Sequence, residues 1–241
     1  MKHYDLVVLG SGYYSVGLAV GVGNALVVDE QYLVDPVFYG TLSGFAPTPC
    51  KDFQGLEAKI GTHFAEPSFR VDERLDICAA EMLLAEYVKK NDVDILLGAV
   101  KVGIGIEGKD YIVTLHTTSG EVKVAARSIV EIPYHKPDTL RFLVRGDIAR
   151  FTDVTHRDAE ISASDAFRDG EFILTVKMPE PLPPEQLTAR ATRIAADIVS
   201  SSEALIVTVA ENGFSSDFPP SVLGPIGEFA RGKDDARRIV S

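Results

Sequence analysis

The feature that most constrains this chain is an apolar run followed by two closely spaced glycines near the N-terminus. Residues 5–9 read DLVVL and lead into GSGYYS at 10–15. A short apolar run without polar alternation is typical of a strand buried on both faces, as in parallel sheets. Residues 15–23 are small and apolar, which favours a tightly packed helix, and residues 25–28 read as a second buried strand. Strand, helix and strand in this order predict a βαβ unit and an α/β fold.

The two glycines have different physical tasks if this turn binds a dinucleotide. Gly10 permits the tight turn out of the first strand, and Gly12 lets a pyrophosphate approach the backbone. The helix that follows offers unpaired N–H groups and the positive end of its dipole to the phosphates. Glu30 comes twenty residues after Gly10, at the end of the second strand, where a carboxylate accepts hydrogen bonds from a ribose. The alternative interpretation is a glycine-rich turn in a doubly wound fold that binds no ligand.

Ser15 occupies the third motif position, which is usually glycine, and serine is small enough for the helix to pack near the strand. Gly21 and Gly23 weaken the helix intrinsically, so we expect packing against the sheet to stabilise it. One of the two tyrosines at the helix start is expected to cover the cofactor or, alternatively, to pack on the sheet. The candidate cofactor-binding residues of this unit are Gly10, Ser11, Gly12, Tyr13, Tyr14, Ser15, Asp29 and Glu30.

The remaining chain predicts a mixture of helices and strands. Residues 31–69 are rich in Gly, Pro and Phe and are expected to be mostly loop. Residues 72–90 predict a helix capped by Asp72, because apolar residues recur there at helical spacing. A β-meander should follow, with one or two strands at 94–106 and a hairpin of 111–117 and 121–130. Further on we expect strands at 140–148, 159–163 and 171–178, a helix at 184–199, a buried strand at 204–210 and a helix at 224–240.

Residues 4–30 resemble the opening of FAD-dependent oxidoreductases of the glutathione-reductase-like family, and a fainter resemblance extends to residue 130. It implies a Rossmann-like FAD/NAD(P)-binding parallel sheet with a β-meander, and FAD as the cofactor. The family often carries a Gly/Ser/Thr-rich stretch after the acidic strand end, and residues 40–44 (GTLSG) correspond to it. Ser43 and Gly44 therefore join the candidate cofactor-binding residues. Residues 224–228, followed by a helix, correspond to the family's final segment, which is aimed at the pyrophosphate and flavin.

The chain is a short and partly degenerate version of that pattern. Residues 129–133 read IVEIP where the family commonly has an Ala-Thr-Gly-like turn. By analogy, residues 1–135 with 216–241 form an FAD-binding domain, and residues 136–215 form a smaller α+β substrate or interaction domain. The predicted function is flavin-mediated oxidation of a small organic substrate. The alternatives are a non-catalytic or partner-dependent flavin-fold subunit of a larger oxidoreductase, a homo-oligomer of that kind, or an NAD(P)-dependent enzyme.

The amino-acid composition limits the kinds of molecule that the chain is expected to bind and indicates a cellular compartment. The net charge of −11 disfavours binding to nucleic acid or to anionic membrane surfaces. Two cysteines without metal-ligand spacing, and no apparent signal peptide, indicate a cytoplasmic protein without a metal site. No catalytic residue is identified. His63 and His135 lie in loops from which either could approach a flavin, and His116 is expected to be structural or exposed. Cys50 is a candidate redox thiol or flavin attachment point, although a plain cysteine is the favoured interpretation.

Overall fold

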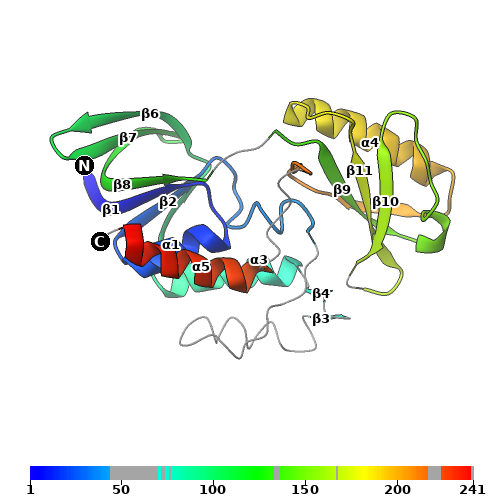
Figure 1. Ribbon diagram of the computed structural model, residues 1–241, viewed down its shortest axis with the longest axis horizontal. Coiled ribbons are helices and arrows are strands. Elements are labelled where there is room, and N and C mark those ends of the chain that lie inside the picture. The colour runs from blue at the N-terminus through cyan, green and yellow to red at the C-terminus, as the bar shows by residue number, and fades with distance from the viewer. Residues whose placement is uncertain are drawn as a thin grey trace.

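Two bodies, each built on one sheet, lie side by side in Figure 1. The computed structural model describes residues 1–43, 70–71, 74–75, 77–132, 136–166, 168–216 and 224–239. The first body carries a six-stranded sheet with a parallel part and a meander, and the second carries a four-stranded antiparallel sheet. This is the predicted α/β class, with a Rossmann-like sheet, a β-meander and a smaller α+β unit.

The centre of the first sheet is β1 (Lys2–Leu9), which pairs in parallel with β2 (Ala25–Asp29) on one side and β8 (Gly120–Glu131) on the other. β5 (Asp94–Leu97) extends the parallel part beyond β2. From Leu6 to Leu9 the side chains of β1 alternate between two apolar clusters, one under the helices and one under the meander. The prediction that residues 5–9 form a strand buried on both faces is therefore confirmed.

The meander completes this sheet on the far side of β8. β7 (Asp110–Thr117) pairs antiparallel with β8, and β6 (Val100–Glu107) pairs antiparallel with β7. The strand order is thus β5-β2-β1-β8-β7-β6, so one edge of β6 has no strand partner among the described residues. The residues predicted as one or two strands, 94–106, divide into β5 in the parallel part and β6 at the free edge.

Helix α1 (Tyr13–Val22) packs closely against α5 (Gly224–Ile239), as Figure 1 shows. Small residues line the contact, because a Cβ at Gly17 or at Gly232 would collide with the backbone of the opposite helix. A Cβ at Gly21 would lie 2.9 Å from the carbonyl oxygen of Lys233. The glycines that lower the intrinsic helix propensity of α1 therefore permit the close approach that stabilises it. The sequence predicts that packing against the sheet stabilises α1, whereas its tightest contacts are with α5.

Helix α3 (Ile77–Lys90) begins later than the sequence predicted. The two-residue strands β3 (Arg70–Val71) and β4 (Arg74–Leu75) pair with each other immediately before it. The predicted first turn is therefore wrong at 74–75, because strand pairing overrides the helical spacing of its apolar residues. Asp72, the predicted cap, lies outside the described residues.

The second body packs one helix, α4 (Pro184–Ser200), on one sheet. Leu187, Ala191 and Ala195 of α4 are buried in the same apolar cluster as alternate residues of the two central strands, β9 (Thr139–Arg145) and β11 (Glu171–Lys177). The predicted strand at 140–148 ends early, because the Asp147 side chain accepts a hydrogen bond from the N–H of Ala149 and starts a 3₁₀ turn. The other elements of this body are η3 (Ile148–Arg150), β10 (Glu160–Asp165) and β12 (Leu205–Val209).

The strand order of the second sheet is β10-β11-β9-β12, so β12 is an edge strand. We predicted a buried strand there, but Leu205 is 65% exposed and Val207 is 45% exposed. A run of apolar residues does not distinguish a buried strand from an edge strand, because its neighbours in the sheet come from distant parts of the chain.

Candidate functional site

The turn between β1 and α1 depends on its two glycines. Gly10 has φ +110° and Gly12 has φ +131°, which are conformations that other residues rarely adopt. A Cβ at Gly10 would also lie 2.8 Å from Cβ of Ile132, the residue that follows β8. The hydroxyl of Ser15 donates to the carbonyl oxygen of Gly10 at 2.7 Å. Serine at the third motif position therefore ties the helix start to the strand end.

The two acidic residues after this turn lie in different environments. Asp29 is buried, and its Oδ2 accepts hydrogen bonds from the N–H and the hydroxyl of Ser11 at 2.5 and 2.9 Å. Its Oδ1 accepts from the N–H of Gln31 at 2.7 Å, so Asp29 fixes the shape of the turn. Glu30 is exposed and makes no hydrogen bond or ion pair within the described part of the chain. Glu30 is therefore the carboxylate available to a ribose.

The side chains of both tyrosines at the helix start are engaged in packing. Tyr13 is buried, and its hydroxyl donates to the carbonyl oxygen of Ala80 at 2.8 Å. Tyr14 donates to Asp235 at 3.1 Å, and the guanidinium of Arg231 lies 4.5 Å from the centre of its ring. We expected one of them to cover the cofactor or to pack on the sheet, and these contacts are with α3 and α5, so what both tyrosines offer a ligand is their backbone.

The N-termini of α1 and α5 point toward the same edge of the first sheet. The start of α5 (Ile226, Phe229) is buried in one cluster with Tyr13 at the start of α1, and Ala236 near the end of α5 is buried in another with Leu18 and Ala19, so the helices run parallel. No side chain of the described residues caps α1, and the first N–H groups of any helix lack acceptors within it. Two positive helix ends therefore meet at the carboxyl ends of β1 and β2, which is where an anion is favoured.

The segment after β2 lies directly over the glycine turn. Oδ1 of Asp35 and Cγ2 of Val37 are 3.5 and 3.6 Å from the position that a Cβ at Gly12 would take. The space beside Gly12 therefore accommodates a methyl group but not a phosphate while residues 34–38 hold this position. The residues present suit the ribose of FAD. The pyrophosphate of FAD would have space beside Gly12 only if residues 34–38 moved away.

Two carboxyl groups that the sequence did not single out lie here, one in this segment and one on α3 in contact with it. Asp35 is 1% exposed, and burial raises its pKa to about 7 although its carboxylate accepts the N–H groups of Phe38 and Tyr39. Glu81 on α3 adds to this rise in the pKa of Asp35. Burial also raises the pKa of Glu81, whose Oε1 accepts the N–H of Val34 at 2.9 Å. Its Oε2 is buried without a partner among the described residues.

Ser43 lies at the junction of the two bodies instead of at the start of α1. It is buried, its Oγ lies 2.5 Å from Oγ1 of Thr41, and it accepts a hydrogen bond from Nη1 of Arg141 at 2.7 Å. Arg141 also stacks on Phe214, with its guanidinium carbon 4.4 Å from the ring centre. Gly44, the residue paired with Ser43 in the prediction, lies outside the described residues.

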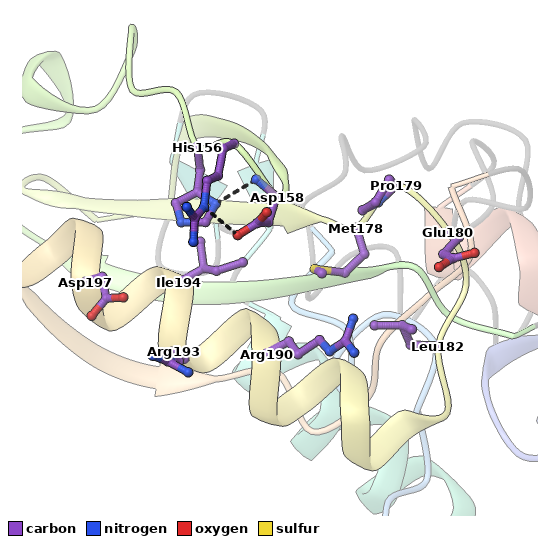
Figure 2. A pocket seen from close by; sticks show the side chains of 11 residues that line it. His156, Asp158, Met178, Pro179, Glu180, Leu182, Arg190, Arg193, Ile194 and Asp197 are labelled. Atoms are coloured by element: carbon purple, nitrogen blue, oxygen red, sulfur yellow. Dashed lines mark hydrogen bonds and ion pairs between the residues drawn. The ribbon is translucent and has the colours of Figure 1, made fainter.

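A surface pocket of about 500 Å³ on the second body lies apart from these residues (Figure 2). Buried Met178, Leu182 and Ile194 form its apolar part. Asp158 contacts the two residues before it, since its carboxylate pairs with Arg157 and its N–H donates to Nδ1 of His156. The rim carries exposed charges of both signs, namely Arg190, Arg193, Glu180 and Asp197. Because water screens such charges, this rim imposes little preference for one ligand charge.

The other candidates add no chemistry to the site. His116 is exposed on β7, as expected, whereas Cys50, His63 and His135 lie outside the described residues. Within the part of the chain that is described, no three metal-ligating side chains gather in one place. In the same part, none of the helices has the length and apolar character needed to cross a bilayer.

Comparisons with known proteins relate the chain to others through structure alone. No family model matches the sequence, and no curated protein matches it. An anhydrotetracycline hydroxylase from Streptomyces rimosus superposes with a TM-score of 0.59 at 17% identity, over 87% of this chain and 51% of that one. An aklavinone-11 hydroxylase, solved with FAD and aklavinone, gives 0.59 at 13% identity, over 100% of this chain and 62% of that one.

A p-nitrophenol 4-monooxygenase from Pseudomonas putida gives a TM-score of 0.57 at 10% identity, over 100% of this chain and 79% of that one. The chain spans about half to three fifths of the length of the first two hydroxylases. At these identities the likeness establishes the fold alone, which this chain shares with the two hydroxylases and the monooxygenase. It does not single out the glutathione-reductase-like family.

Proposed function

We propose that this chain binds FAD at the carboxyl ends of β1 and β2 and takes part in flavin-mediated oxidation of a small organic substrate. The observation that carries the proposal is the turn at Gly10–Gly12, which leads from β1 into α1 at a place where the start of α5 also packs. The fold is shared with an aklavinone hydroxylase solved with FAD and its substrate. A bound flavin would supply the redox chemistry, and the protein would orient the reactants.

The described residues suit particular parts of the cofactor. The backbone from Gly10 to Ser15 would face the pyrophosphate, and exposed Glu30 would accept hydrogen bonds from the ribose. Asp29 would act indirectly, because its carboxylate already holds Ser11 in the turn. As part of the same proposal, residues 1–135 with 216–241 form the cofactor domain and residues 136–215 the substrate domain. Membership of the glutathione-reductase-like family and a cytoplasmic location also belong to this proposal.

Asp35 gives the proposal a sharp test, because its carboxyl lies where the pyrophosphate must approach Gly12. An ionised carboxylate there repels a phosphate, and two unit charges 4 Å apart interact with about 4 kcal/mol at an effective dielectric of 20. Asp35→Asn should therefore tighten FAD binding by about tenfold or more at pH 8, and Gly12→Asp should abolish it. Equal FAD affinity in the wild type and both variants would refute this site.

Thermal-shift measurements with FAD, NAD and NADP identify the cofactor, because a ligand that binds only the folded state raises the melting temperature. We expect FAD to give the largest shift, since the β-meander argues against a nicotinamide enzyme. A larger shift with NAD or NADP would favour the nicotinamide alternative.

A non-catalytic or partner-dependent subunit is the second candidate, and two observations favour it. Asp35 and Val37 close the space beside Gly12, and the free-edge strand β6 exposes apolar side chains. Val102 is 62% exposed and Ile106 is 76% exposed, and exposed apolar edge strands mark association surfaces. Sedimentation of the purified chain distinguishes the two candidates. Self-association without flavin supports the subunit, and a flavin-bound chain that turns over a substrate unaided contradicts it.

A further inference from the structure

Arg141 occupies an unusual place in the second sheet. It lies on β9 between Leu140 and Phe142, which are both fully buried in the cluster beneath α4. Because successive side chains of a strand point to opposite faces, Arg141 belongs to the face away from α4. The register sets Thr175 of β11 beside it, and Ser162 of β10 beyond Thr175.

The charge of Arg141 has no carboxylate counter-ion among the described residues. Among the described residues it contacts the hydroxyl of Ser43 and the ring of Phe214, and burial lowers its pKa. Acidic residues are abundant, since the chain has 35 of them against 24 basic ones. Seven other arginines do pair with acids, namely Arg127, Arg145, Arg150, Arg157, Arg231, Arg237 and Arg238.

A half-buried cation without a counter-charge is costly, so a site that retains one is suited to bind an anion from outside. A guanidinium presents a planar fork of donors that matches a carboxylate. On the same face, Leu143 and Ile173 are directly paired neighbours and give an apolar surface next to the charge. We infer that Arg141 binds the carboxylate of a small organic acid whose apolar part lies over Leu143 and Ile173. In naming this acid as the substrate, the inference rests on the proposed flavin function.

The test measures binding of benzoate and of its neutral analogue benzamide by calorimetry and thermal shift, with and without FAD. We expect the wild-type chain to bind benzoate and to bind benzamide at least about tenfold more weakly. Arg141→Gln should weaken benzoate binding by about tenfold or more, and Arg141→Lys should keep part of it. Equal binding of the two analogues by the wild type would overturn the inference, even if Arg141→Gln failed to fold.

Arg190→Gln is the matched control, because Arg190 lines the pocket of Figure 2 and also lacks a carboxylate partner among the described residues. We expect this variant to bind benzoate like the wild type. Loss of benzoate binding in Arg190→Gln, with retention in Arg141→Gln, would place the ligand in that pocket and contradict the inference. A chain that binds benzoate through Arg141 but no FAD would refute the flavin function and leave the anion site standing. A chain that binds FAD but no benzoate would refute the anion site and leave the flavin function standing.

Discussion

Replacing Asp35 with asparagine should change how the stability of the protein depends on pH. The pKa of Asp35 is about 7 in the folded state, against 3.8 for an ordinary aspartate, because the carboxyl is buried. Folding therefore favours the protonated form. The contribution of protonated Asp35 to the free energy of unfolding is fully present below about pH 4 and is lost as the pH rises toward 7.

The magnitude follows from this interval. Each unit of pKa difference corresponds to about 1.4 kcal/mol, so Asp35 costs the folded state about 4 kcal/mol between pH 4 and pH 7. The calculated isoelectric point is 4.9, so measurements should start at pH 5.5 to avoid precipitation. Between pH 5.5 and pH 8 we expect the wild type to lose about 2 kcal/mol more than Asp35→Asn. Glu81 is present in both proteins, so the comparison isolates Asp35 together with its interaction with Glu81.

The assay is urea unfolding followed by circular dichroism at pH 5.5, 6.5, 7.5 and 8. Asp153→Asn is a suitable control, because Asp153 is exposed and has no partner among the described residues. This control should follow the wild type across the whole range. If Asp35→Asn lost as much stability as the wild type, Asp35 would not be the buried acid that the structure shows.

Three further substitutions test the packing around the turn. Gly17→Ala should destabilise the protein by about 1–3 kcal/mol in urea unfolding, because a Cβ collides with the backbone of α5, whereas Gly105→Ala, with open space around it, should be tolerated. Ser15→Ala should cost about 1 kcal/mol in the same assay through loss of the bond to the strand-end carbonyl, and a stability equal to the wild type would contradict this. Arg231→Met should lower the melting temperature more than Glu228→Gln, because it leaves the buried Glu228 carboxylate unpaired, and the opposite order would refute that account.

Local sequence patterns were sufficient to predict the first unit of the fold. The apolar run before Gly10 specifies a strand buried on both faces, and the glycines specify the turn, since both are properties of adjacent residues. Helix α4 was equally predictable, because Pro184 at its start and the buried residues at helical spacing agree with each other. These elements needed no knowledge of what packs against them.

Features that depend on distant residues were not predictable. Nothing near Gly17 in the sequence indicates that α5, more than two hundred residues later, packs against it. The close approach of Asp35 to Gly12 depends on the folded path of the loop, of which the sequence shows only a turn signal, an aspartate followed by proline. Arg141 was missed because an arginine in an alternating strand usually faces water. That no described carboxylate pairs with it is visible only when the two bodies are assembled.

The most direct test of the account is an equilibrium titration of the purified chain with FAD at pH 6.5, followed by flavin fluorescence. The account predicts saturable binding of one FAD per chain by the wild type and loss of that binding in Gly12→Asp. A wild-type chain that fails to bind FAD, or a Gly12→Asp variant that binds it unchanged, would contradict the assignment of the glycine turn as the cofactor site.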